Sequence, residues 1–325
     1  MPGLAVTIKI IILFALLGLF TIGFISGCST PSDESNERVI EDPIVPLAQF
    51  DPVFAIPEPV FSGIHTEINE RAVIDHSNKH DGYVIVKMLD DLVNNMRVLI
   101  TSPCGREYIY DISADKQEVF PLSKGNGLYT IGVFEHVEND IYTQILLASI
   151  DVDLKDEFAP FIRPNRYVDY NKDSMIVKKA AELTKEIDCF FAAVEAIFLF
   201  VVDHVEYDYE FANVVEFDYL PDLDDVLEQG KGICFDMAAL TVAMLRSQGI
   251  PTKLIMGDYD DDLLDYSYHA WVSVFSKENG WIANWISFHG DTWNILDPTL
   301  ASRAGLDIAS QAINNDSEYK AMFVY

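Results

Sequence analysis

The glycine-rich turn at residues 230–236, Gly-Lys-Gly-Ile-Cys-Phe-Asp, does most to limit the possible folds of this chain. Its two glycines allow a tight backbone turn. From Asp236 onward, apolar residues recur at three- and four-residue spacing, which predicts a helix. Gly249 and Pro251 follow as a typical helix stop. We therefore expect Cys234 at the start of a buried helix.

Strand-like runs follow this helix at residues 252–256, 269–275 and 293–296. His269 opens the second run, and Asp297 comes directly after the third, before a proline that stops it. Neighbouring antiparallel strands can bring such residues side by side although 28 positions separate them in the sequence. The order cysteine, histidine, aspartate therefore predicts three side chains that meet in the fold.

These residue types suit nucleophilic catalysis. A cysteine attacks as the thiolate, which a helix N-terminus and a neighbouring imidazolium both stabilise, and Cys234 is placed for both effects. Asp297 would accept a hydrogen bond from one ring nitrogen of His269 and leave the other to face sulfur. Free N–H groups at the helix start could bind a developing oxyanion. The residues alone leave a second interpretation open, a buried cysteine with ordinary surface groups.

The formal net charge of −30 comes from acidic residues spread along the chain. A nucleic-acid-binding protein needs a basic surface, so we expect no nucleic-acid partner. A polybasic membrane-surface site is disfavoured for the same reason. Solubility on an exposed protein surface is the simplest role of the charge.

The N-terminus predicts export. Lys9 precedes an apolar run over residues 10–25, which is typical of a signal sequence. The run ends Ile-Ser-Gly-Cys at Cys28, which resembles the lipobox of bacterial lipoproteins. We predict a lipoprotein signal peptide at residues 1–27, lipidation of Cys28 and a proline-rich linker at 28–59. The alternative is an uncleaved signal anchor, although the run is short for a spanning helix. In both cases the chain is extracytoplasmic and tethered to the bacterial cell membrane.

Residues 60–162 predict an all-β module of the immunoglobulin-like sandwich type. Short strand-like runs at roughly ten-residue spacing, separated by turn clusters, favour an antiparallel sandwich. The runs are residues 83–88, 97–100, 108–112, 129–134 and 142–147. We find no catalytic arrangement here, and expect a spacer or packing role. Binding of carbohydrate or cell-wall polymer is a weaker alternative.

Two helices are predicted before the glycine turn. Ser174 is a plausible N-cap for a helix over residues 175–185. A second, very apolar helix over 187–204 contains acidic residues, which favours a buried core helix over a membrane span. Cys189 is expected to pack there as a small apolar residue. It could pair with Cys104, but the two fall in different predicted domains, so we expect no disulfide.

The motifs together resemble the transglutaminase-like superfamily over about residues 193–299. They are Tyr207-Asp208, the 230–236 turn, Leu-Arg-Ser-Gln-Gly-Ile-Pro at 245–251, Gly257, His-Ala-Trp-Val at 269–272, and Trp293 with Leu-Asp-Pro-Thr at 296–299. The resemblance implies a papain-like α+β core at 163–325, a helix packed on an antiparallel sheet. It also implies a catalytic triad of Cys234, His269 and Asp297.

The resemblance leaves the reaction open. Its members are similar to transglutaminases, cysteine proteases, peptide N-glycanases and catalytically silent binding modules, and the active ones attack a carbonyl through a thioester. Tyr207 is a weak candidate for the oxyanion side chain. The loop at 258–265 contains five aspartates. It could bind calcium, but it lacks the spacing of an EF-hand loop. A solvated acidic loop that favours basic substrates is the preferred interpretation.

We therefore predict a lipid-anchored thiol enzyme that acts on peptide or protein amide bonds and needs neither cofactor nor metal. Water as the second nucleophile makes it a protease or amidase, which is slightly favoured; an amine makes it an acyltransferase. A silent binding module on the cell surface is the alternative. The oligomeric state is not predicted.

Overall fold

The computed structural model describes residues 49–52, 55–89, 96–112, 117–139, 141–216, 218–260, 268–282, 286–315 and 318–325. These residues belong to one compact unit. The predicted signal peptide, Cys28 and most of the predicted linker lie outside the described residues. Within the described part of the chain, no helix combines the length and the apolar character that a membrane span requires.

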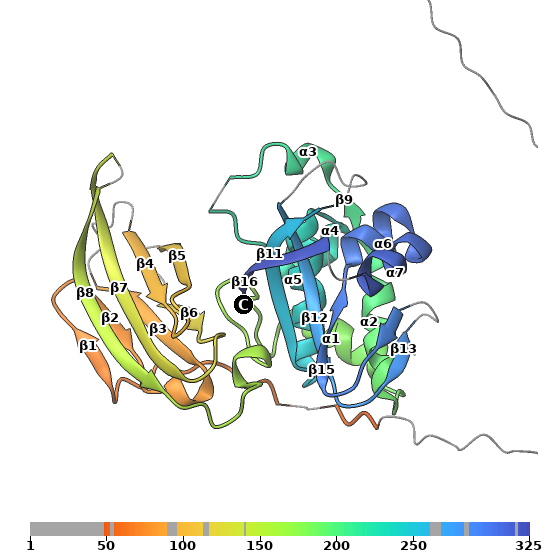
Figure 1. Ribbon diagram of the computed structural model, residues 1–325, viewed down its shortest axis with the longest axis horizontal. Helices are drawn as coiled ribbons and strands as arrows, with labels where there is room; N and C mark the ends of the chain where they lie inside the picture. The colour runs from red at the N-terminus through yellow and green to blue at the C-terminus, as the bar shows by residue number, and fades with distance from the viewer. Residues whose placement is uncertain are drawn as a thin grey trace, which may run out of the picture. The chain divides into compact units, whose positions relative to one another are not determined.

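The N-terminal part of this unit contains two four-stranded antiparallel sheets (Figure 1). The first has the order β1-β2-β3-β6 and the second the order β5-β4-β7-β8. Residues from both sheets belong to one hydrophobic core. The strands are β1 Thr66–Ile68, β2 Ala72–Asp75, β3 Tyr83–Met88, β4 Met96–Thr101, β5 Glu107–Ile112, β6 Gln117–Pro121, β7 Gly127–Glu138 and β8 Ile141–Val152.

Alternation of apolar and polar residues explains these strands. In β4, Met96, Val98 and Ile100 are buried, and the residues between them are only half-buried. Each of the five strand-like runs in the sequence corresponds to one observed strand. β1, β2 and β6 are strands that the sequence did not indicate.

Helix α5, Cys234–Ser247, lies at the centre of the C-terminal part, and every residue from Asp236 to Ser247 is buried. A helix that is buried all round must be covered on several sides. Helices α1 (Met175–Thr184), α2 (Phe190–His204), α4 (Leu223–Gln229) and α6 (Pro298–Ala304) pack against it, together with strands β10 (Lys231–Gly232), β11 (Thr252–Tyr259) and β12 (Tyr268–Ser276). The other helices are α3 Tyr209–Ala212 and α7 Leu306–Asn314, with 3-10 turns η1 Lys79–Asp81 and η2 Ala159–Phe161.

The sheet that faces the site has the order β15-β12-β11-β16 and is antiparallel throughout. Figure 1 shows β11 and β12 beside α5. Its strands are β11 Thr252–Tyr259, β12 Tyr268–Ser276, β15 Thr292–Leu296 and β16 Tyr319–Val324. Two short pairs complete the part, antiparallel β13 Gly280–Ile282 with β14 Ile286–Phe288, and parallel β9 Glu206–Tyr207 with β10 Lys231–Gly232. The chain is therefore α+β, as predicted.

Two helix starts differ in detail from the prediction. Ser174 precedes α1, but its side chain makes no cap bond. Instead, the carboxylate of Asp224 accepts hydrogen bonds from the N–H groups of Met175 and Ile176 at 3.0 Å each. Helix α2 begins three residues later than predicted, because Cys189 is extended and forms a bridge with the distant Gln49.

Candidate active site

The glycine turn positions Cys234 as the first residue of α5. Gly230 ends α4 in the left-handed region at φ 62°, which favours glycine. Gly232 is required for a different reason, since a Cβ there would lie 2.7 Å from the Cβ of Asp236. The turn therefore fixes where the helix begins. The Cys234 side chain is left partly exposed and unpaired with another cysteine.

Asp236 fixes the same helix start from within. Its carboxylate accepts a hydrogen bond from the backbone N–H of Ile233 at 2.8 Å and another from the Tyr219 hydroxyl at 2.8 Å. The side chain is buried, and this desolvation raises the pKa of Asp236 despite both hydrogen bonds. The sequence analysis placed Asp236 in the 230–236 motif and predicted no separate role for it. The signal for its role was an acidic residue three positions after the helix N-cap.

Replacing Tyr219 with phenylalanine is expected to lower the free energy of unfolding by about 1–3 kcal/mol, because Asp236 would keep only one of its two hydrogen-bond donors in a buried setting. Denaturant unfolding measures the loss. Tyr209→Phe is the matched control, since Tyr209 is 57% exposed and its hydroxyl meets Arg303 at the surface. Equal stability of the two variants would contradict the role given to Tyr219.

His269 lies near the start of β12, and Asp297 directly follows the neighbouring strand β15. His269 Nε2 lies 2.8 Å from Asp297 Oδ2, and both side chains are 0% exposed. Asp297 is also the N-cap of α6, where Oδ1 accepts from the N–H of Leu300 at 2.9 Å. The β12–β15 pairing, with Val272 opposite Leu296, places the two residues at the same end of the sheet.

The imidazole also reaches the thiol. The Cys234 thiol is near enough to the imidazole to affect the pKa of His269, by its charge and by hydrogen bonding. Since Nε2 faces Asp297, Nδ1 is the ring nitrogen on the sulfur side. Burial by itself would lower the pKa of His269, but the charge and hydrogen bond of Asp297, together with Cys234, outweigh burial and raise this pKa to about 10. The structure thus brings the three predicted residues into one chain of contacts, with a histidine that favours its protonated form.

Tyr319 is a site residue that the sequence did not indicate. Its hydroxyl donates to Asp297 Oδ2 at 3.0 Å, on the same oxygen that His269 contacts. Its ring packs against Tyr259 and Trp271, which also flank the imidazole. This aromatic surrounding keeps water from the buried pair and strengthens its electrostatic interaction. No signal marked Tyr319, because β16 itself was not predicted.

The structure also describes Tyr207 and part of the acidic loop. Tyr207 pairs in register with Gly232 beside the turn, and its ring packs on Tyr209 under the guanidinium of Arg303. In the acidic loop, Asp260 forms an ion pair with Lys320 at 2.9 Å. The remaining aspartates from position 261 onward lie outside the described residues. Over the described part of the chain, no cluster of three or more His, Cys, Asp or Glu residues is arranged to hold a metal ion.

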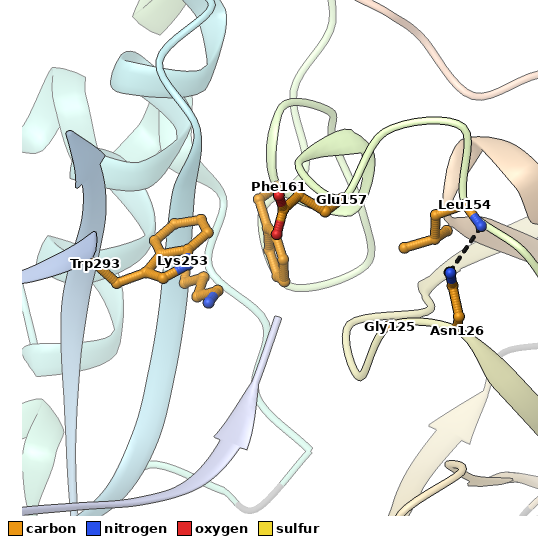
Figure 2. A pocket seen from close by; sticks show the side chains of 7 residues that line it. All are labelled: Gly125, Asn126, Leu154, Glu157, Phe161, Lys253 and Trp293. Atoms are coloured by element: carbon orange, nitrogen blue, oxygen red, sulfur yellow. Dashed lines mark hydrogen bonds between the residues drawn. The ribbon is translucent and has the colours of Figure 1, made fainter. Parts of the chain in front are cut away.

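A cavity of about 310 Å³ lies elsewhere, between the loop after β6 and the start of β11 (Figure 2). Lys253 Nζ lies 3.4 Å from the ring centroid of Trp293 and 4.8 Å from that of Phe161. Burial and the charge of Lys124 lower the pKa of Lys253 to about 8, and Glu157 opposes them. None of the residues that line this cavity belongs to the Cys-His-Asp group, so the cavity is not the reaction site.

The fold and these contacts define a thiol site in which a helix start meets a histidine-aspartate pair on a sheet. Residues 177–284 match the model of the transglutaminase-like superfamily, a span that includes Cys234 and His269 and ends before Asp297. The chain therefore carries a transglutaminase-like domain there. Members of this superfamily are generally cysteine-dependent enzymes.

Comparison with solved structures finds similar folds at low identity. A candidate cysteine protease from Cytophaga hutchinsonii is 18% identical, with a TM-score of 0.36, over 77% of this chain and 76% of its own. The periplasmic domain of TgpA from Pseudomonas aeruginosa is 15% identical, with a TM-score of 0.31, over 76% and 78%. Red sea bream transglutaminase is 13% identical, with a TM-score of 0.32, and this chain spans 49% of its length. No curated protein sequence matches this chain.

Proposed function

We propose that this protein is a thiol enzyme that cleaves or transfers peptide or protein amide groups through a thioester. One observation carries the proposal: the buried His269–Asp297 pair at 2.8 Å, with the thiol of Cys234, at a helix start, near enough to raise the pKa of His269. A partly exposed thiol, a histidine that holds a proton and a carboxylate that orients it are the parts that acyl transfer requires.

In the proposed mechanism, Cys234 sulfur attacks the amide carbonyl as the thiolate. The first N–H groups of α5 stabilise the oxyanion. His269, protonated, donates its Nδ1 proton to the leaving amine as the C–N bond breaks, which leaves a thioester and a neutral imidazole. The imidazole then takes a proton from water or from an amine as that molecule attacks the thioester. The thiolate leaves, and a carboxylic acid or a new amide is released.

We place hydrolysis first and transamidation second. The partial exposure of Cys234 lets water reach a thioester without any further binding site. The catalytically silent binding module is the second candidate function, and the geometry of His269 counts against it: a site used only for binding gains nothing from a buried imidazole held between a thiol and a carboxylate.

The test is mass spectrometry of the whole protein after incubation with a library of short peptide amides, with and without a dansylated alkylamine. A peptide adduct on Cys234 and released acid support hydrolysis, and dansylated product supports transamidation. A protein that forms no adduct and no product while remaining folded favours the binding module.

We propose further that the folded part is extracytoplasmic and anchored to the bacterial membrane through a lipid on Cys28. The lipobox-like Ile-Ser-Gly-Cys after an apolar run supports this location, and the linker at 28–59 would hold the folded part off the membrane. Incorporation of labelled palmitate that Cys28→Ala abolishes is the expected result. Incorporation that survives this substitution would contradict the anchor.

We also propose the division into an immunoglobulin-like module at 60–162 and a transglutaminase-like domain at 163–325. The strand order supports it, because β1-β2-β3-β6 and β5-β4-β7-β8 divide one run of eight strands between two sheets, as Greek-key sandwiches do. Peptide or protein is the proposed substrate, and the net charge of −30 argues against a nucleic-acid partner.

A further inference from the structure

A second cavity, of about 280 Å³, lies along the segment that joins the two parts of the chain. We call it the crossover pocket. Its lining includes Glu58, Glu118, Asn165, Arg166, Asp169 and Tyr170. It draws on both parts of the chain, since Glu118 belongs to β6 and Leu220, which also lines it, precedes α4.

Unpartnered polar atoms on buried side chains mark this pocket. Asn165 is 3% exposed, and its Oδ1 accepts from the N–H groups of Tyr167 and Val168 at 3.0 and 3.2 Å. These bonds fix the orientation of the amide, so Nδ2 is a donor, and Nδ2 has no partner. Arg166 Nε and the Tyr170 hydroxyl likewise have none. Buried polar groups are almost always hydrogen-bonded, so three unpartnered atoms on residues that line one cavity favour a ligand with acceptor oxygens.

The charges of the lining residues indicate the charge of that ligand. Arg166 is already paired with Glu118 inside the pocket. The lining then has two further carboxylates, Glu58 and Asp169, both exposed at the surface. Because the lining contains three carboxylates and one guanidinium, binding of an anionic ligand is disfavoured. A neutral carbonyl inside and a positive charge at the rim are favoured.

Residues next to those that line the pocket pack against Phe235, the neighbour of the reacting thiol. Tyr167, within the same segment, packs on Phe235 with ring centroids 5.7 Å apart, and Phe235 follows Cys234 directly. Tyr219 packs on the same ring at 6.2 Å and precedes Leu220 of the lining. Residues next to the pocket lining are therefore in contact with the residue that follows Cys234.

We propose that the crossover pocket binds a cationic peptide segment of the substrate, with backbone carbonyls toward Asn165 and a lysine- or arginine-type side chain toward Glu58. The proposal rests on the proposed function, because it names a substrate class for the Cys234 site. A binding measurement tests it instead of turnover, so that the pocket proposal and the proposed function can fail separately.

The experiment measures fluorescence anisotropy of a fluorescein-labelled acetyl-Gly-Lys-Gly-Gln-Gly amide, and of its norleucine counterpart, with the whole chain carrying Cys234→Ala. Asn165→Asp keeps the acceptor for Tyr167 and Val168 and replaces the Nδ2 donor with a charged oxygen that cannot donate. The effect is therefore read on the norleucine peptide, which has no cation for the new charge to attract, and its Kd should rise five- to tenfold. Glu58→Gln keeps the acceptor for the Lys172 N–H and removes one charge, so the preference for lysine over norleucine should fall two- to threefold.

Because Glu58 is at the surface, Glu58→Gln should fold and still test the proposal even if Asn165→Asp does not fold. Iodoacetamide labelling of Cys234 in the active chain should be the same with and without either substitution. Binding that neither substitution changes means that the pocket holds ordered water only, and overturns the proposal. Failure of the parent to prefer the lysine peptide overturns it as well, whether or not Cys234 forms thioesters.

Discussion

Replacing Cys234 with alanine is expected to reduce amide turnover by at least about a thousandfold with the fold retained. Sulfur forms the thioester, and no other side chain in the proposed mechanism can replace it. Cys234 is the first residue of α5 and partly exposed, and alanine is favourable in a helix. The thermal midpoint should therefore move by no more than about 4 °C. Measured release of product from the peptide amides checks the loss of turnover, and thermal unfolding checks that the fold is retained.

Cys189→Ala is the matched control. Cys189 also lies at a helix start, as the N-cap of α2, and it is similarly half-buried. It differs from Cys234 in its setting, because His269 contacts Cys234. Turnover should be unchanged by Cys189→Ala, and iodoacetamide at pH 6 should alkylate Cys234 faster than Cys189. Equal alkylation rates, or turnover that survives Cys234→Ala, would instead favour the binding module.

The sequence was most informative where local pattern and chemistry agree. The helix start at Cys234 followed from a glycine turn and apolar periodicity, and the strands with His269 and Asp297 at their ends followed from short apolar runs. Each of these signals lies within about fifteen neighbouring residues. Antiparallel pairing then brings the two strand ends together, because it is the simplest connection between such runs.

Contacts between distant residues decided what the sequence did not indicate. Asp224 caps α1 from a position 48 residues beyond Ile176. β16 is an edge strand whose pairing partner β11 lies 60 residues earlier, so Tyr319 and its contact with Asp297 had no local signal. β1 has only three residues, and β2 is buried at all four positions, so neither shows alternation. β6 ends in a proline, which counts against a run as a strand.

The second large effect is expected from Asp297→Asn, which should lower turnover roughly a hundredfold to ten-thousandfold. Asparagine keeps an oxygen for the Leu300 N–H, so the cap of α6 survives. The substitution removes the negative charge beside His269, and burial then lowers the pKa of the imidazole instead of being outweighed. His269 must hold a proton for the leaving amine, so the alkaline limb of the pH–rate profile should move to lower pH.

Stability should change with pH in a defined direction. The pKa of His269 is about 10 in the folded protein, above the ~6.5 of an unfolded chain. The pair therefore contributes its full stabilisation below about pH 6.5 and loses it as pH rises toward 10. The difference in free energy of unfolding between the parent and Asp297→Asn should be largest below pH 6.5, on the order of a few kcal/mol, and should narrow with rising pH.

Tyr319→Phe separates the charge of Asp297 from its surroundings. It removes the hydroxyl that donates to Oδ2 at 3.0 Å and leaves the carboxylate in place. Turnover should fall about tenfold to a hundredfold, the size of one hydrogen bond to a charged group. The alkaline limb should stay above pH 7, because His269 keeps its counter-charge. If Tyr319→Phe moved the limb as far as Asp297→Asn does, hydrogen bonding rather than charge would hold the proton on His269, and the role proposed for Asp297 would be wrong.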